Sequence, residues 1–392
     1  MSTINNENIF AVICEFNPFH LGHSYLIDET RKNTGSKYCI ALMSGDYVQR
    51  GEPAVFDKYT RTRMALMNGA DLVIELPTIY ATASAEGFAK GAVSLLNSLN
   101  CVDYLSFGSE NGNIKELMDM AYILNNPSPE DDSRMRELIK SGISYPKARD
   151  IVFGQYDVAK DIISAPNNIL AVEYIRALLS LGSSITPFTT ERKSMGYNSD
   201  CIDENAAYCS ALSIRNCISM RNNAYTGYVP ENSLELYSEK PVFINDFSDV
   251  IYYSLSSQSP EELSEYLDVN KELSHKIVKN LCNYKTAEDF IDLLKSKNIT
   301  RSRISRALIH IVLGITCNPV ETIPTYARIL GFRKEAASLL TTLKDKSDIS
   351  IISKLKDYGS SPELDIDIKG ATLYEQIRKT YQNEYSSQIV II

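Results

Sequence analysis

Long apolar runs, paired cysteines and an excess of positive charge are all missing from this sequence of 392 residues. No stretch approaches the length of a membrane-spanning helix, and residues 1–8 lack the basic and apolar regions of a secretory signal. The eight cysteines form no C-x-x-C pair, so we interpret them as reduced thiols of a cytosolic protein without a structural metal. The net charge of −9 argues against a protein that binds nucleic acid through bulk charge.

Short buried runs alternate with helical patterns in the first part of the chain. The runs are typical of strands buried on both faces and lie at 10–14, 38–43, 71–75 and 104–107. Helical segments lie between them, at about 22–32, 57–68 and 85–99. A helix at 168–181, a strand at 184–189 and a helix at 206–220 are expected further on. The alternation predicts an α/β fold with βαβ units and a parallel sheet.

The character of the sequence changes near residue 230. Residues 231 to about 357 show mostly helical periodicity, and the tail after them is less regular. We therefore predict two domains, a sheet-containing domain over 1–230 and a mostly α-helical domain over 231–392. Within the second, residues 271–306 carry nine lysines and arginines against four acidic residues, a balance of 9 − 4 = +5. This run is either a contact for a polyanion or a solvated helix face.

The segment from Cys14 to His23 carries the strongest indication of chemistry. A strand ends there, a loop with Asn17 follows and a helix begins near Gly22, at the sheet edge where open α/β sheets bind ligands. The free N–H groups and dipole of a helix start favour a phosphate. His20 and His23 lie three residues apart, on one face of the first turn. They can stabilise charge that grows on phosphate oxygens. The alternative is a helix end with two surface histidines.

The run Asn17-Pro-Phe-His-Leu-Gly-His23 resembles the signature of the HIGH-type nucleotidyltransferase superfamily, which has a Rossmann-like fold. Ser210-Ala-Leu-Ser-Ile-Arg215 resembles the second motif of that superfamily, a serine-rich turn with an arginine that opens a helix. There we expect Ser213 to cap the helix and Arg215 to hold the β- and γ-phosphates of ATP. The alternative is a capped helix with a surface arginine.

Further blocks narrow the resemblance. They follow in order as Met43–Val55, Asp71–Pro77, Phe107–Gly112, Pro166–Leu170 and Thr189–Arg192. Together with the first motif they are similar to the bacterial tRNA(Met) cytidine acetate ligase family. The similarity is dense in the N-terminal half and continues more weakly, through 365–369, in the C-terminal half.

The resemblance implies an enzyme that joins acetate and ATP into acetyl-adenylate and then acetylates the wobble cytidine of elongator tRNA(Met) to N4-acetylcytidine. Its expected cofactors are ATP and Mg²⁺. The basic run at 271–306 is then the candidate tRNA contact, and no membrane partner is expected. The candidate catalytic residues are Asn17, His20, His23, Asp46, Ser213 and Arg215. The ATP contacts implied by the resemblance are Ile13, Cys14, Glu15, Phe16, Asn17, Pro18, Phe19, His20, Leu21, Gly22, His23, Ser24, Tyr25, Leu26, Gly108, Asn167, Asn168 and Arg192. Cys14 departs from the small apolar residue that the family pattern has there.

The loop from Ser44 to Glu52 follows the second strand and so also lies at the carboxyl edge of the sheet. Asp46, Gln49, Arg50 and Glu52 are candidates to position acetate or cytidine, and the alternative is an ordinary polar surface loop. Two other functions stay open for the whole chain. One is a small-molecule nucleotidyltransferase that moves AMP from ATP to a phosphate-bearing metabolite, and the other is a nucleotide-binding scaffold without catalysis.

Overall fold

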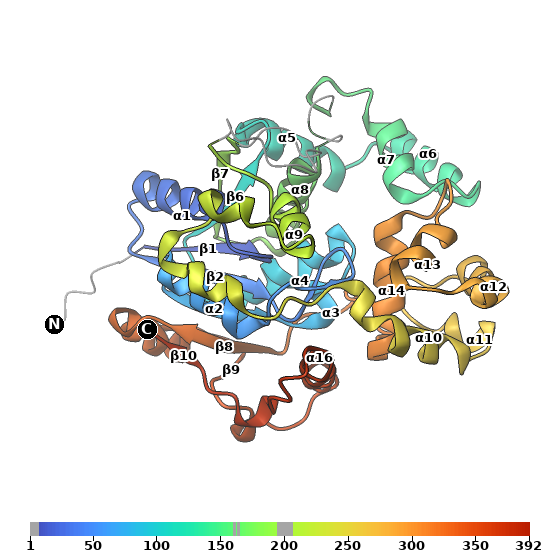
Figure 1. The fold of residues 1–392 in the computed structure, drawn as a ribbon. Helices are drawn as coiled ribbons and strands as arrows, with labels where there is room; N and C mark the ends of the chain where they lie inside the picture. The colour runs from blue at the N-terminus through green and yellow to red at the C-terminus, as the bar shows by residue number, and fades with distance from the viewer. Residues whose placement is uncertain (1–7, 160–161, 163–164, 194–206) are drawn as a thin grey trace.

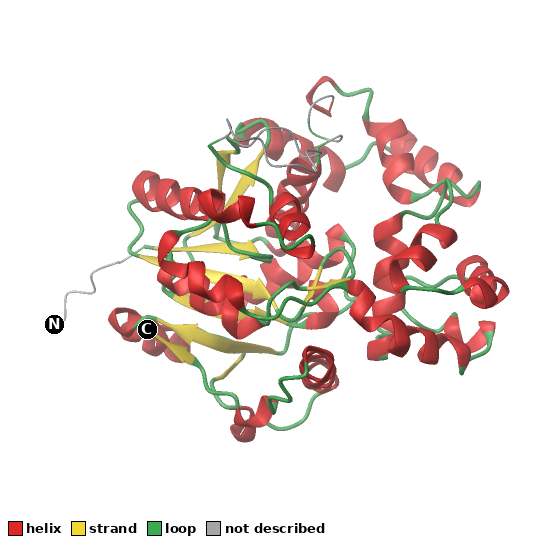
Figure 2. Cartoon of the chain, in the orientation of Figure 1, coloured by secondary structure: helices red, strands yellow, loops and turns green. Residues whose placement is uncertain are grey.

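The structure is a computed structural model that describes residues 8–159, 162, 165–193 and 207–392. A mainly parallel sheet lies at its centre with helices on both faces (Figures 1 and 2). In the described residues this sheet has eight strands in the order β10-β8-β5-β2-β1-β6-β7, with β9 beside β8. The strands are β1 Ile9–Cys14, β2 Tyr38–Ser44, β5 Leu72–Leu76, β6 Tyr104–Ser109, β7 Thr186–Glu191, β8 Tyr326–Phe332, β9 Ser350–Ile352 and β10 Val390–Ile391, and a separate hairpin pairs β3 Tyr47–Val48 with β4 Glu52–Pro53.

The helices fall into those that flank the sheet and a group, α10 to α14, that lies to one side of it (Figure 1). Their bounds are α1 Leu21–Thr34, α2 Lys58–Met67, α3 Thr78–Ala81, α4 Ala85–Ser98, α5 Ile114–Asn125, α6 Pro129–Lys140, α7 Tyr145–Phe153, α8 Pro166–Leu181, α9 Ala211–Ser219, α10 Ser248–Ser256, α11 Pro260–Leu263, α12 Lys271–Asn280, α13 Ala287–Leu294, α14 Arg301–Leu313, α15 Ala337–Lys346 and α16 Pro362–Arg378. None of the helices in these described ranges is long and apolar enough to cross a bilayer.

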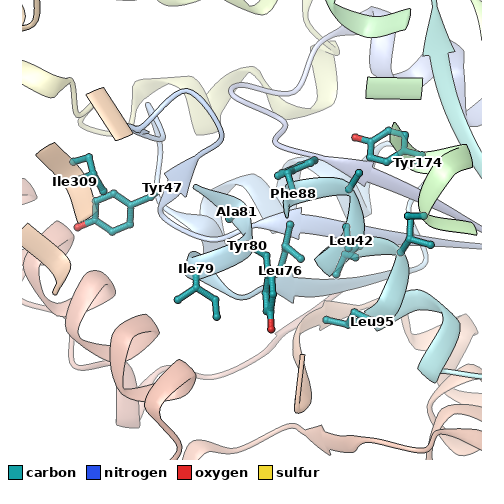
Figure 3. Packing of buried hydrophobic residues seen from close by; sticks show 14 of the residues in the cluster. Leu42, Tyr47, Leu76, Ile79, Tyr80, Ala81, Phe88, Leu95, Tyr174 and Ile309 are labelled. Carbon is teal, nitrogen blue, oxygen red and sulfur yellow. The ribbon is translucent and has the colours of Figure 1, made fainter. Parts of the chain in front are cut away.

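Alternating side chains of the central strands divide the core into two layers. Ile40 and Leu42 of β2 belong to the cluster that packs against α4 and α8, and Figure 3 shows Leu42 there beside Phe88 and Tyr174. Cys39 and Ala41 of the same strand belong to the cluster on the other face, with α1 and α2. Successive side chains of a strand point to opposite faces, so a strand covered on both sides is apolar throughout. The predicted α/β fold is confirmed.

Strand direction explains where a ligand site can form. β1 runs parallel to β2 and β6, β2 runs parallel to β5, and β6 runs parallel to β7. The carboxyl ends of these five strands therefore meet at one edge of the sheet, and the loops that follow them lie together there.

The C-terminal part of the chain returns to this sheet. β8 pairs antiparallel with β5, and β9 and β10 both pair with β8, although the sequence pattern of 231–392 is mostly helical. The tail expected to be less regular holds α16, which begins with Ser361 as its N-cap and Pro362 in its first turn. The predicted helix at 206–220 is shorter and spans Ala211–Ser219; residue 206 lies outside the described residues.

The loop after β2 rests on α16. The hydroxyl of Tyr47 donates to the carbonyl of Gly370 at 3.0 Å, and the hydroxyl of Tyr374 donates to the carbonyl of Ala54 at 2.7 Å. A buried ammonium group, Lys58 Nζ, lies beneath the same loop and pairs with Glu75 at 2.8 Å and with Glu384. The end of the chain thus supports a loop at the carboxyl edge of the sheet.

Candidate active site

A cavity of about 1030 Å³ opens at the carboxyl edge of the sheet. Its wall combines the end of β1 and the loop after it, the β3–β4 loop, the end of β6 and the N-terminal turns of α8 and α9. The segment from Lys295 to Ser305, which includes the first turns of α14, closes another side. Segments far apart in the sequence therefore share one ligand-sized space.

The two motif histidines hold the start of α1 together. His20 is the N-cap, and its Nδ1 accepts a hydrogen bond from the Gly22 amide at 3.1 Å. The Nδ1 of His23 accepts from the His20 amide at 3.1 Å, and the two rings stack with centroids 3.7 Å apart. Because each Nδ1 is an acceptor, the proton of each neutral imidazole is on Nε2. Both histidines line the cavity, so they bring N–H donors to it.

Burial and neighbouring cations keep these imidazoles neutral. Burial, with the charges of Arg192 and Arg215, lowers the pKa of His20 to about 3. Burial is also the main cause that lowers the pKa of His23, and His20 and Arg192 add to it. The histidines therefore act as hydrogen-bond donors, and the positive charge at this end of the cavity comes from the arginines.

Two arginines from distant segments line the same end of the cavity. Arg215, in the first turns of α9, donates from Nη1 to the carbonyl of Asn17 at 2.7 Å. Arg192, just after β7, donates to Asn167 Oδ1 at 3.4 Å. A Cβ on Gly108 would lie 3.2 Å from Cγ of Arg192, so Gly108 makes room for that side chain.

The N-terminus of α8 is occupied by a carboxylate of the protein. Glu110, which follows β6, accepts from the amide of Asn167 at 3.2 Å and from that of Asn168 at 2.8 Å. The Oδ1 of Asn168 accepts from the Glu110 amide in return, at 2.8 Å. Asn167 lines the cavity, whereas Asn168 is fully buried behind it. Asn168 therefore holds Glu110 in place from behind the wall, and a direct contact with ATP stays an untested prediction.

Some residues of the predicted ATP-binding segment 13–26 line a cavity, and the others do not. Ile13, Cys14, Glu15, Phe16, Asn17, His20, His23 and Leu26 line the large cavity, and Gly22 and Tyr25 line a small adjoining one with Arg192 and Lys193. The other four, Pro18, Phe19, Leu21 and Ser24, line neither of these two cavities. Phe19 is fully buried, with its ring 4.7 Å from that of Phe16.

Ser213 and Asp46 do not reach the cavity wall. The expectation that Ser213 caps α9 is wrong, because Ser210 is the N-cap and accepts from the Ser213 amide at 3.0 Å. Asp46 is buried beneath the loop after β2, where its Oδ1 accepts from the amide of Lys58 at 2.9 Å. Both side chains therefore lie outside the cavity wall, and direct catalytic roles for them stay untested predictions.

Three aromatic wall residues were not proposed as site residues from the sequence. Phe88, Phe107 and Tyr174 form an aromatic wall; the Phe107 and Tyr174 rings have centroids 5.8 Å apart. In the sequence these residues cannot be distinguished from residues of the hydrophobic core, because they occur at the same apolar positions of helices and strands. Lys295, Lys297 and Arg301 belong to the predicted basic run and line the same cavity. Gln49, Arg50 and Glu52 also line the cavity, as their place after β2 indicated.

Known proteins are similar to this chain over most of its length. The model of the HIGH Nucleotidyl Transferase family matches residues 7–388. A protein of Thermoanaerobacter sp. (strain X514) named tRNA(Met) cytidine acetate ligase is 41% identical over 365 residues, 89% of each chain. One of the same name from Acetivibrio thermocellus is 36% identical and covers 98% of this chain and 100% of its own.

Two crystal structures of Thermotoga maritima TmcAL are similar over almost the whole fold. The form bound with alpha-thio ATP has a TM-score of 0.89 and 28% sequence identity, and covers 98% of this chain and 99% of its own. The apo form has a TM-score of 0.91 at the same identity and coverage.

Proposed function

Because the chain belongs to the HIGH nucleotidyl transferase family, among relatives named tRNA(Met) cytidine acetate ligase, we propose that it joins acetate to a cytidine of tRNA(Met) at the expense of ATP. The observation that carries the proposal is the single cavity that unites two kinds of surface. The wall contains the histidine pair, Arg192 and Arg215, and it also contains the basic residues Lys295, Lys297 and Arg301. Such a cavity suits a nucleotide and an RNA strand at once.

The first chemical step is activation of acetate. Acetate is a poor acyl donor, so its carboxylate attacks the α-phosphorus of ATP, pyrophosphate leaves, and acetyl-adenylate forms. The Nε2–H groups of His20 and His23 and the guanidinium of Arg215 would stabilise charge on the phosphate oxygens during this displacement. Positioning dominates such steps, and the short bond from Arg215 to the carbonyl of Asn17 fixes the cation against the motif loop.

We include Mg²⁺ in the proposal as the ion that accompanies the triphosphate. Mg²⁺ prefers oxygen ligands and binds proteins through one or two carboxylates together with substrate phosphates. Glu52, a carboxylate in the cavity wall, is of the right chemical type. When bound, the ion supplies positive charge next to the phosphates.

The second step presents the RNA base. We propose that the acceptor is the wobble cytidine of elongator tRNA(Met), which can be splayed out of its loop, and that the product is N4-acetylcytidine. The basic residues on the α14 side of the cavity would hold the anticodon backbone through phosphate contacts. In this proposal the division near residue 230 separates the part that binds ATP from the part that holds RNA, and the protein works in the cytoplasm, where tRNA is modified.

A direct test uses purified protein, ATP, Mg²⁺, labelled acetate and unmodified elongator tRNA(Met). The RNA is digested and searched for labelled N4-acetylcytidine, which we expect with the wild type. We expect the label to be lost with His23→Ala and kept with Lys32→Ala, an exposed change on the same helix. ATP consumed only with phosphorylated metabolites, and no label in the RNA, would instead support a small-molecule nucleotidyltransferase.

A further inference from the structure

The described part of the cavity wall has three acidic side chains among its cations and donors: Glu15, Glu52 and Glu110. Glu15 follows β1 directly, two residues before Asn17, and lines the same cavity as His20, His23 and Arg215. A carboxylate repels the phosphates of ATP, so its charge works against the ligand proposed for this end. A group that donates hydrogen bonds is the natural partner of such a side chain.

Glu15 is held at both its main chain and its side chain. Its main-chain carbonyl accepts a hydrogen bond from Arg61 Nη1 at 2.6 Å, and its Oε1 accepts one from the main-chain N–H of Gln49 at 3.0 Å. In the described ranges, no hydrogen bond or ion pair involves the other carboxylate oxygen, Oε2. One oxygen therefore fixes the carboxylate, and the second is available at a set position.

The surface near Glu15 suits a flat base. Phe88, Phe107 and Tyr174 line the cavity with it, and the rings of Phe107 and Tyr174 have centroids 5.8 Å apart. Bases that are read or modified outside a duplex contact aromatic and apolar side chains and form hydrogen bonds along their edges. The exocyclic amine of cytosine carries two N–H donors, and glutamate is a typical acceptor for them.

We propose that Glu15 accepts a hydrogen bond from the exocyclic amine of the acceptor cytidine and takes its proton during acetyl transfer. In that step a bond forms between the amine nitrogen and the acetyl carbon. The bond from the acetyl carbon to the AMP oxygen breaks, and AMP leaves as an anion with the electron pair. The amine proton moves to Glu15 Oε2 and from there to solvent. The inference rests on the proposed function and names the residue that serves its second step.

Two other roles for Glu15 act earlier in the reaction, and both would make it the ATP contact that the family resemblance implies. The carboxylate of Glu15 can accept a hydrogen bond from a ribose hydroxyl of ATP, or bind Mg²⁺ beside the triphosphate. Either role would affect formation of acetyl-adenylate, whereas the proposed role affects only transfer. The two half-reactions can be measured separately, so they distinguish these roles.

The test compares Glu15→Gln with Asp28→Asn, the same acid-to-amide change at an exposed position of α1. The substituted glutamine keeps a side-chain oxygen that can accept from the main-chain N–H of Gln49, so the loop that follows β1 should keep its position. Acetate-dependent exchange of pyrophosphate into ATP, without tRNA, measures activation. Transfer is measured in a single turnover, with acetyl-adenylate formed first on the enzyme and elongator tRNA(Met) then added.

We expect Glu15→Gln to keep pyrophosphate exchange within about threefold and to slow transfer by about 10²–10⁴-fold, the usual loss when a general base is removed. Glu15→Asp keeps the charge but moves it away from the amine, so its transfer rate should lie between those of the wild type and Glu15→Gln. Equal losses in exchange and transfer, or unchanged transfer, would overturn the inference. If the wild type exchanges pyrophosphate but labels no cytidine, the proposed function itself fails and the inference falls with it.

Discussion

Ser305 donates its hydroxyl to the main-chain carbonyl of Gly51 at 2.6 Å. This contact joins α14, whose first turn carries Arg301, to the loop that carries Gln49, Arg50 and Glu52. Both segments line the cavity. The surface proposed for RNA and the loop beside the reacting groups are therefore packed directly on each other, and their relative position depends on a close approach at Gly51.

Gly51→Ala should separate these two segments. Gly51 has φ of +74°, and a Cβ there would lie 2.2 Å from the Arg306 amide nitrogen. Gly35→Ala is the matched control, because Gly35 also has a positive φ, +64°, but has open space around it. In urea unfolding we expect the control to lose about 1–2 kcal/mol and Gly51→Ala to lose about 1–3 kcal/mol more from overpacking. Equal losses in the two variants would show that the close approach is unimportant.

Arg61→Lys should disturb the loops after β1 and β2 together. The fully buried guanidinium of Arg61 donates to the carbonyls of Glu15 and Ser44, at 2.6 and 3.0 Å, and also to those of Phe56 and Gly45. A lysine cannot reproduce this fork. We expect a loss of about 2–4 kcal/mol in the free energy of unfolding, because buried carbonyls lose their donors, and slower acetate activation. Arg63→Lys, exposed on the same helix, should stay within about 0.5 kcal/mol of wild type.

Asp46→Asn should change how stability depends on pH. Burial raises the pKa of Asp46 from its ordinary 3.8 to about 7. Between these values the folded protein keeps a proton that the unfolded chain has lost, so stability from this group falls as pH rises toward 7, by up to about 1.4 kcal/mol per pH unit. Asp367 has the same direction, with a pKa of about 7, so the variant should reduce the slope without removing it. The cationic neighbours of Glu384 lower its pKa to about 2, so its effect on stability appears only at lower pH. Urea titrations above about pH 5 therefore measure the effect of Asp46 separately. An unchanged slope would contradict the assignment.

His20 and His23 should remain neutral Nε2–H imidazoles in the free protein from about pH 5 to pH 8, where an ordinary histidine titrates. The lowered pKa values and the two Nδ1 acceptor bonds both require this form. Ring nitrogen chemical shifts report the tautomer directly. His20→Asn, which keeps an N-cap acceptor, assigns the His20 signals and should slow pyrophosphate exchange by about 10²-fold. A ring that titrates near 6.5 and disappears in this variant would disprove the prediction.

Lys297→Ala should weaken tRNA binding without affecting acetate activation. Lys297 is exposed and lines the cavity, whereas Lys279, also exposed and basic, does not line it. We expect the slope of log K against log salt concentration to decrease by about 1 for Lys297→Ala and to stay unchanged for Lys279→Ala. Filter binding at several salt concentrations measures this slope. The same slope for both variants would show that the basic run acts only as a diffuse surface charge.

The sequence indicates local features of the site better than its long-range supports. The strand, loop and helix around His20 and His23 follow from neighbouring residues, and so does the placement of the Glu52 loop at the sheet edge. Asp46 sits in the same loop pattern, yet its side chain turns inward because Lys58 and Glu75 form a buried ion cluster below it. Arg61 reads as an exposed position on a helix, and only the packed structure shows the carbonyls that surround it.

Strand β8 illustrates the same limit in the fold. Apart from Arg328 it has no charged residue, but a mostly apolar run of seven residues at 326–332 is equally compatible with a buried helix. Pairing with β5 makes this run a strand, and nothing near β8 in the sequence indicates that partner.

The buried cluster around Lys58 has a consequence for the order in which this protein matures during synthesis. Tyr59 and Glu384, which meet in that cluster, are 325 residues apart. While the ribosome has yet to release the segment around Glu384, Lys58 and Arg328 lack a carboxylate that both contact in the finished protein. Both cations are then left with Glu75, which each of them also contacts, and a buried ion cluster that lacks one of its carboxylates is strongly destabilised. The loop after β2 should therefore reach its final form only when translation has passed this residue. A nascent chain that already contains both nucleotide-binding motifs would thus remain inactive, and ATP would not be spent by incomplete copies.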